Sequence, residues 1–214
     1  MNSPEQILFL PGASGNVDFW RPAAASMQLE SCIVHHIGWP GIGPTPVDPA
    51  IRTLPDLAGR IVAMLDRPTA LVAQSMGGVV ALLAALACPR RVTHLALAAL
   101  SGGFDLARFG ASDWRPPREE RRPVPAHLFV NDEAELSAEF RSLDVPILLM
   151  FGDNDPISPP SAGAWLRDQL PHAQLHVLPG ASHTFAMETH APQVSELIDR
   201  FLSGATAAAV RRAP

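Results

Sequence analysis

The chain has few cysteines and no lysine. Its two cysteines, Cys32 and Cys88, lie far apart in a chain of 214 residues, so they predict neither a disulfide framework nor a cysteine-rich metal site. A chain of this length buries enough apolar surface to fold without such links. So few thiols fit a reducing compartment, and we expect a cytoplasmic protein.

The chain also lacks an excess of positive charge and long apolar runs. All 16 basic residues are arginine, against 21 Asp and Glu, and the net charge of −5 argues against nucleic acid as a partner. The longest apolar runs, such as residues 79–88, are well short of the roughly 18 residues that span a membrane. The first ten residues lack the basic start and cleavage site of a signal peptide. We therefore expect no membrane partner and no secretion.

Short apolar runs alternate with longer amphipathic stretches, which is typical of parallel strands joined by crossover helices. This predicts an α/β fold with a mainly parallel sheet of about six strands and helices on both faces. Strands are predicted at residues 6–10, 32–37, 69–73, 94–100, 146–151 and 174–178. Helices are predicted at residues 19–27, 53–65, 76–87, 160–170 and 191–202.

Residues 101–145 interrupt this alternation, since they show no strand pattern and include a Pro/Arg-rich stretch at residues 114–125. So long a connection is usually a lid or a disordered link. Its apolar residues are too many for a solvated linker: Phe104, Phe109, Trp114, Leu128, Phe129 and Phe140. We predict a helical cap at residues 101–145, inserted into a core formed by residues 1–100 and 146–203. Residues 204–214 are predicted to be a disordered tail.

The sequence Leu-Val-Ala-Gln-Ser-Met-Gly-Gly at residues 71–78 is the most informative motif. An apolar strand runs directly into Ser75, and a helix is predicted to begin at Met76. A nucleophile on such a sharp turn needs small neighbours, which Ala73 and Gly77 provide. The start of the helix would place free N–H groups beside the reacting oxygen. Ser75 is the predicted nucleophile, and the alternative is a serine that only caps a helix.

Two later loops carry carboxylates and a histidine. Asp153 and Asp155 follow the strand predicted at residues 146–151, and His183 follows the strand predicted at residues 174–178. In a doubly wound sheet, loops at the carboxyl ends of the strands bind the ligand, and Ser, Asp, His is the triad order for such a sheet. The alternatives are carboxylates that only form turns and a histidine that only caps the next helix.

A glycine-rich loop, Leu-Pro-Gly-Ala-Ser-Gly, follows the first predicted strand at residues 10–15. It could direct a backbone N–H towards the nucleophile and, with the N–H of Met76, stabilise an oxyanion, each donor contributing roughly 10² to 10³ in rate. A phosphate-binding loop is the alternative. The absence of G-x-G-x-x-G, of Gly-Lys-Ser/Thr and of any lysine argues against it.

These segments resemble the α/β-hydrolase family, and within it the small bacterial carboxylesterases with a helical cap, which are related to pimeloyl-acyl-carrier esterases and carbon–carbon bond hydrolases. The resemblance extends from about residue 6 to residue 202. It rests on residues 11–15, 38–43, 73–77, 152–155 and 180–183.

The resemblance implies a role for each motif residue. Ser75 would be the nucleophile, Asp155 the acid and His183 the base, and the N–H groups of Ala13 and Met76 would form the oxyanion hole. Asp155 is favoured over Asp153 because the acid of the family comes three residues after the glycine.

The chain departs from the family pattern in four places. Pro11 stands where many relatives have a histidine before the glycine, so any hydrogen bond from that histidine is lost. Ala73 replaces the first glycine of the serine motif, which the space at the turn tolerates. Gly38 stands where relatives often have an aspartate. The two antiparallel strands that open many relatives have no room before Gln6, so we expect six strands.

The resemblance predicts a serine hydrolase that acts on carboxylic esters of small or medium acyl chains through an acyl-enzyme. No cofactor and no metal is expected, because the implied mechanism needs neither. The adjacent His35 and His36 could suggest a metal site, but consecutive strand residues point to opposite faces and cannot share an ion. Trp114 and Phe129 of the predicted cap are the expected substrate-binding residues. The alternatives are a carbon–carbon bond (meta-cleavage-type) hydrolase and a non-catalytic ligand sensor on the same fold.

The expected partner is a small-molecule ester. The arginines of the cap could also meet an acidic substrate or an acyl-carrier protein: Arg115, Arg118, Arg121 and Arg122. Since Glu119 and Glu120 lie among them, a solvated stretch of mixed charge is the favoured interpretation.

Overall fold

The computed structural model describes residues 3–29, 32–113 and 135–204. They form a sheet of six parallel strands in the order β2-β1-β3-β4-β5-β6, as the alternation of apolar runs predicts. The strands are β1 (Gln6–Leu10), β2 (Ile33–His36), β3 (Thr69–Gln74), β4 (Val92–Ala98), β5 (Ile147–Gly152) and β6 (Ala173–Leu178). The helices are α1 (Arg21–Ala24), α2 (Leu54–Val62), α3 (Met76–Ala87), α5 (Pro160–Gln169) and α6 (Ala191–Leu202).

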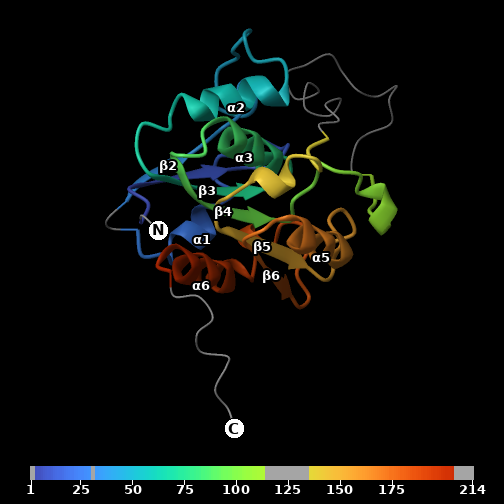
Figure 1. The fold of residues 1–214 in the computed structure, drawn as a ribbon. Helices are drawn as coiled ribbons and strands as arrows, with labels where there is room; N and C mark the ends of the chain where they lie inside the picture. Colours follow the sequence, from blue (N-terminus) through green and yellow to red (C-terminus); the bar gives the residue numbers. More distant parts are fainter. Residues whose placement is uncertain (1–2, 30–31, 114–134, 205–214) are drawn as a thin grey trace.

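Helices cover both faces of the sheet, and Figure 1 shows α2 and α3 above it and α6 below. Alternate side chains of each central strand enter two separate cores. On β1, Leu8 and Leu10 belong to the core that also contains residues of α2, α3 and α5, whereas Ile7 and Phe9 belong to the core that contains residues of α1 and α6. This is the period-two pattern of a sheet that is buried on both faces.

The first predicted helix, at residues 19–27, is largely wrong, because only Arg21–Ala24 are α-helical. Pro22 fits the first turn of a helix. Beyond it, the N–H of Ser26 bonds to the carbonyl of Ala23, and the N–H of Met27 bonds to that of Ala24. These are three-residue spacings, so the chain continues as tight turns rather than as an α-helix.

Strand β4 begins and ends two residues earlier than predicted. It ends at Ala98 because Ala99 has a φ of 48°, a left-handed conformation that an extended strand cannot contain. The N–H of Ala99 still donates to the carbonyl of Met150 on β5 at 2.8 Å. The end of β4 is therefore a fixed kink.

The described flanks of residues 101–145 pack on the main core. They contain two 3-10 helices, η1 (Ala107–Phe109) and η3 (Phe140–Ser142), and Phe104 and Phe140 lie in the same core as α3 and α5. Residues 114–134, the middle of the predicted cap, and residues 205–214 of the predicted tail lie outside the described residues. In the described part of the chain no helix is long and apolar enough to cross a membrane.

Candidate active site

Ser75 lies on a sharp turn between β3 and α3. Its φ of 54° and ψ of −126° are unusual for a residue with a side chain. The turn is held by neighbouring backbone: the N–H of Ser75 donates to the carbonyl of Ala98 on β4, and the N–H of Gly78 donates to the carbonyl of Ser75, each at 2.9 Å. The structure therefore contains the sharp strand-to-helix turn that the motif predicts.

The loop after β1 packs directly against this turn. A Cβ added to Gly77 would lie 2.2 Å from the carbonyl oxygen of Pro11, and one added to Gly12 would lie 3.2 Å from the Cβ of Ser75. The first of these distances is far shorter than a van der Waals contact. Glycine at both positions thus lets the glycine-rich loop approach Ser75.

Ser75, His183 and Asp155 form a hydrogen-bonded series. The Nε2 of His183 lies 3.1 Å from the Oγ of Ser75, and its Nδ1 lies 2.8 Å from the Oδ2 of Asp155. They come from the ends of three strands, β3, β6 and β5. The side chain of Asp155 is fully buried and that of His183 is 19% exposed, so water reaches the imidazole but not the carboxylate.

The second oxygen of Asp155 is held by its own loop. Oδ1 accepts the N–H of Ile157 at 2.9 Å and the N–H of Ser158 at 3.0 Å. With Oδ2 on His183, both carboxylate oxygens are occupied. These bonds hold the carboxylate beside the imidazole.

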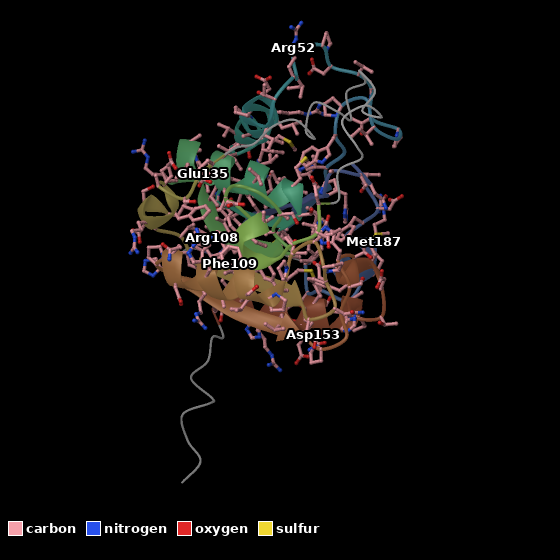
Figure 2. All side chains as sticks on the ribbon, turned by 90° about the vertical axis from the view of Figure 1, so that its right-hand side faces the viewer. Arg52, Arg108, Phe109, Glu135, Asp153 and Met187 are labelled. Carbon is pink, nitrogen blue, oxygen red and sulfur yellow. The ribbon has the colours of Figure 1, made fainter. Side chains whose placement is uncertain are left out.

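Asp153, the other candidate acid, has a different partner. Its Oδ1 accepts the N–H of Gly180 at 2.6 Å, and its own N–H donates to the carbonyl of Leu178 at 3.2 Å. Figure 2 shows it at the edge of the molecule, on the same side as Met187. Asp153 therefore links the loop after β5 to the loop after β6, and the described structure shows no hydrogen bond between it and His183.

The loop that carries His183 is clamped by a carboxylate. The hydroxyls of Ser182 and Thr184, on either side of His183, donate to the two oxygens of Glu188. The bond from Thr184, followed by that from Ser182, lowers the pKa of Glu188 below its ordinary value, because both favour the charged form. The buried side chain of Gln74 also donates to the carbonyl of His183, at 3.3 Å.

The two predicted oxyanion donors are backbone groups of two segments that pack against each other, the glycine-rich loop and the turn at Ser75. Met76 is the first residue of α3, where N–H groups have no partner within the helix. The N–H of Ala13 has no acceptor within residues 3–29, 32–113 and 135–204. Both groups are therefore available to a ligand oxygen.

The remaining candidates differ in their outcome. Trp114 and Phe129 lie outside the described residues. His36 stacks on Phe9 with ring centroids 4.9 Å apart, and burial lowers its pKa. Over the described ranges, no group of three or more His, Cys, Asp or Glu side chains is placed to hold a metal ion.

Three residues at the site were missed by sequence reasoning. Gln74 directly precedes the nucleophile, Ser158 comes three residues after Asp155, and the indole N–H of Trp39 donates to the carbonyl of Gly12. All three lie in or beside segments that carry the family resemblance. Their position in or beside these segments indicated that they lie near the site, but no rule of spacing predicts their hydrogen-bond partners.

A cavity of about 560 Å³ lies elsewhere, between the segment before β1 and helix α6. Its lining includes Ser3, Cys32 and Ser195. It contains none of the predicted site residues, so it does not belong to the site around Ser75.

The parallel sheet and the loops at its carboxyl ends define the α/β-hydrolase class of fold. A family model described as "Alpha/beta hydrolase family" matches residues 7–197, and the chain belongs to this family.

Individual proteins that resemble this chain are named as esterases or hydrolases. The chain is 25% identical to a pimeloyl-acyl-carrier-protein methyl ester esterase of Nitrosomonas europaea, over 85% of this chain and 89% of that one. It is 34% identical to a 2-hydroxymuconate semialdehyde hydrolase of Pseudomonas putida, over 40% of this chain and 30% of that one. A thermophilic esterase from Thermogutta terrifontis superposes with a TM-score of 0.74 at 19% identity, over 97% and 92% of the two chains.

Proposed function

We propose that the protein is a serine hydrolase that cleaves carboxylic esters of small or medium acyl chains through an acyl-enzyme. The observation that carries this proposal is the series from Asp155 through His183 to Ser75, at 2.8 Å and 3.1 Å. A serine is a weak nucleophile until a base accepts its proton, and the base works best when a third group orients it. All three groups are within hydrogen-bond reach of one another.

In the first half of the reaction the Oγ of Ser75 attacks the ester carbonyl and transfers its proton to the Nε2 of His183. Asp155 accepts the Nδ1–H bond and stabilises the imidazolium. The carbonyl electrons move to oxygen, where the N–H groups of Ala13 and Met76 would stabilise the negative charge. The intermediate collapses, the C–O bond breaks, and the alcohol leaves with the proton from His183.

In the second half a water molecule replaces the alcohol. His183 takes a proton from the water as the water oxygen attacks the acyl carbon of the acyl-enzyme. Collapse of this second intermediate releases the carboxylic acid and returns the proton to Ser75. No cofactor or metal takes part, and the cycle leaves the enzyme unchanged.

The substrate class is inferred from the segment between β4 and β5. A cap over residues 101–145 with Trp114 and Phe129 against the acyl chain would favour an uncharged, apolar acyl group. The Nitrosomonas europaea relative is named for an ester carried on an acyl-carrier protein, so we keep an acyl-carrier protein as a candidate partner. A small-molecule ester in the cytoplasm remains the primary proposal.

Carbon–carbon bond hydrolysis is the second candidate, because a relative over 40% of the chain is named a 2-hydroxymuconate semialdehyde hydrolase. The two reactions share the base and the oxyanion donors but differ in the leaving group, which is an alcohol in one and a carbon fragment in the other. An enzyme that cleaves a meta-cleavage product faster than every ester tested would favour this second candidate.

Multiple turnover tests the proposal. Wild-type protein and Ser75→Ala would be incubated with chromogenic esters of increasing acyl length, together with labelling by a fluorophosphonate probe. We expect product well beyond one equivalent and a loss of about 10⁶-fold in Ser75→Ala. A single stoichiometric burst from folded protein would instead favour a ligand sensor, and activity retained in Ser75→Ala would exclude Ser75 as the nucleophile.

A further inference from the structure

Trp39, just after β2, is fully buried, and its indole donates a hydrogen bond to the main chain of the glycine-rich loop. The Nε1–H of Trp39 lies 2.8 Å from the carbonyl oxygen of Gly12. The N–H of Gly15 donates to the same oxygen at 3.0 Å. The carbonyl of Gly12 therefore has both of its acceptor positions occupied, one by a rigid side chain and one by the turn itself.

The carbonyl of Gly12 belongs to the same peptide group as the N–H of Ala13. Every described peptide bond is trans, and in a planar trans peptide the C=O and the N–H point in opposite directions. Fixing the carbonyl towards Trp39 thus fixes the Ala13 N–H away from it. This N–H has no acceptor among the described residues, while Gly12 lies against Ser75.

We infer that Trp39 is a positioning residue for the oxyanion hole: its indole N–H holds the Gly12–Ala13 peptide so that the Ala13 N–H is presented to the reacting carbonyl. This inference rests on the proposed serine-hydrolase function, since an oxyanion donor has no role without attack by Ser75. Preorganised donors stabilise a transition state because they need not reorient as charge develops.

A second tryptophan provides a matched control. Trp20 is also buried, and its Nε1–H donates to the carbonyl of Leu10 at 2.9 Å. The peptide held in this way is Leu10–Pro11, and proline has no N–H to present. Loss of this bond removes a similar packing and hydrogen-bond contribution but cannot release an oxyanion donor.

The experiment compares Trp39→Phe with Trp20→Phe in the full chain. Each substitution keeps an aromatic ring and removes one indole N–H. We measure kcat and KM for the preferred chromogenic ester, the rate of Ser75 labelling by a fluorophosphonate, and Tm. For Trp39→Phe we expect kcat and the labelling rate to fall about tenfold, with KM nearly unchanged. This fall is smaller than the roughly 10² to 10³ lost when an oxyanion donor is deleted, because the N–H of Gly15 still holds the carbonyl of Gly12.

The control is expected to keep kcat and labelling within about twofold of wild type, while both variants lose a similar amount of Tm. Equal losses of kcat in the two variants, or an effect of Trp39→Phe on KM alone, would overturn the inference. The proposed function would still stand in that case, provided that the wild type shows Ser75-dependent turnover. If the wild type shows no Ser75-dependent turnover or labelling, the proposed function fails and the inference with it. If Trp39→Phe does not fold, Trp39→His is tested in its place, because its ring keeps an N–H donor. Activity of folded Trp39→His as low as that of Ser75→Ala would count against the inference.

Discussion

The hydroxyl of Ser158 donates a hydrogen bond to the main-chain carbonyl of Ala99 at 3.0 Å, joining the loop after β5 to the end of β4. The hydroxyl of Ser101 donates to the same carbonyl, also at 3.0 Å, and contacts the hydroxyl of Ser158. Both serines are buried. Since the N–H of Ser158 also holds Asp155, this residue connects the buried carboxylate to the sheet.

Ser158→Ala is expected to lower kcat by about tenfold with little change in KM, because the turn around Asp155 loses its link to β4. The loss of stability should be modest, about 1 kcal/mol, since Ser101 still satisfies the carbonyl of Ala99. Ser195→Ala is the matched control: Ser195 is buried to a similar degree, but its hydroxyl bonds to the carbonyl of Ala23 and so joins α6 to α1 rather than holding a site residue. Equal effects of the two changes on kcat would contradict the prediction.

The two acidic residues of the loop after β5 should differ sharply in their effect on activity. Asp155→Asn is expected to reduce kcat by about 10⁴-fold, because an amide cannot both accept the Nδ1–H of His183 and stabilise the imidazolium. Asp153→Asn should cost less than tenfold, since an amide oxygen can still accept the N–H of Gly180. Steady-state kinetics on both variants decides the matter, and the reverse ranking would assign the acid to Asp153.

Two glycines in helices should respond to alanine in opposite ways. At Gly77 the added Cβ would lie 2.2 Å from the carbonyl oxygen of Pro11, whereas at Gly59 in α2 it would meet nothing within 4 Å. Gly77→Ala should destabilise the fold and move the glycine-rich loop away from Ser75, lowering kcat. Gly59→Ala should raise the free energy of unfolding by about 0.5–1 kcal/mol through helix propensity. Denaturant titration and ester kinetics measure both, and a neutral Gly77→Ala would be inconsistent with the close packing of the loop.

The stability of the protein should fall as the pH is lowered through about 6.5, the ordinary pKa of histidine. Burial lowers the pKa of His94, and its Nδ1 has no hydrogen-bond partner among the described residues. The unfolded chain therefore takes up a proton that the folded chain resists, so acid favours unfolding. Burial lowers the pKa of His36 and of His176 in the same direction.

His94→Leu should flatten this dependence, because it removes one group whose pKa is lower in the folded than in the unfolded chain. Val92→Ala on the same strand is the control for lost packing, and it should lower stability by a similar amount at every pH. The measurement is the free energy of unfolding in denaturant at several pH values between 5 and 8. A slope in His94→Leu as steep as in the wild type would refute the assignment to His94.

The parts of the fold that follow from periodicity could be read from the sequence. Helices α3 and α6 match their predicted bounds, and all six strands are within two residues of them, because buried strands are short apolar runs and the helices between them begin and end at clear breakers. The end of β4 could not be read in this way. It depends on the left-handed φ of Ala99, which alanine rarely adopts and no local pattern indicates.

The site likewise has parts that the sequence predicts and parts that it does not. Ser75, Asp155 and His183 are brought together because each follows a strand of one parallel sheet, which their order already indicated. Trp39 and Ser158 could not be assigned, because each bonds to a main-chain oxygen of a distant segment. Any residue can offer such an oxygen, so the sequence contains no mark of the partner.

Many of the bonds around Ser75 end on main-chain carbonyls, including those of Gly12, Ala98, Ala99 and His183. A carbonyl acceptor is the same whichever side chain the residue carries. Substitution at several of these positions can therefore change the residue without deleting the bond, so long as the path of the chain is kept. The loops around Ser75 can therefore accept many side-chain changes along their length while the main-chain bonds that position them stay in place.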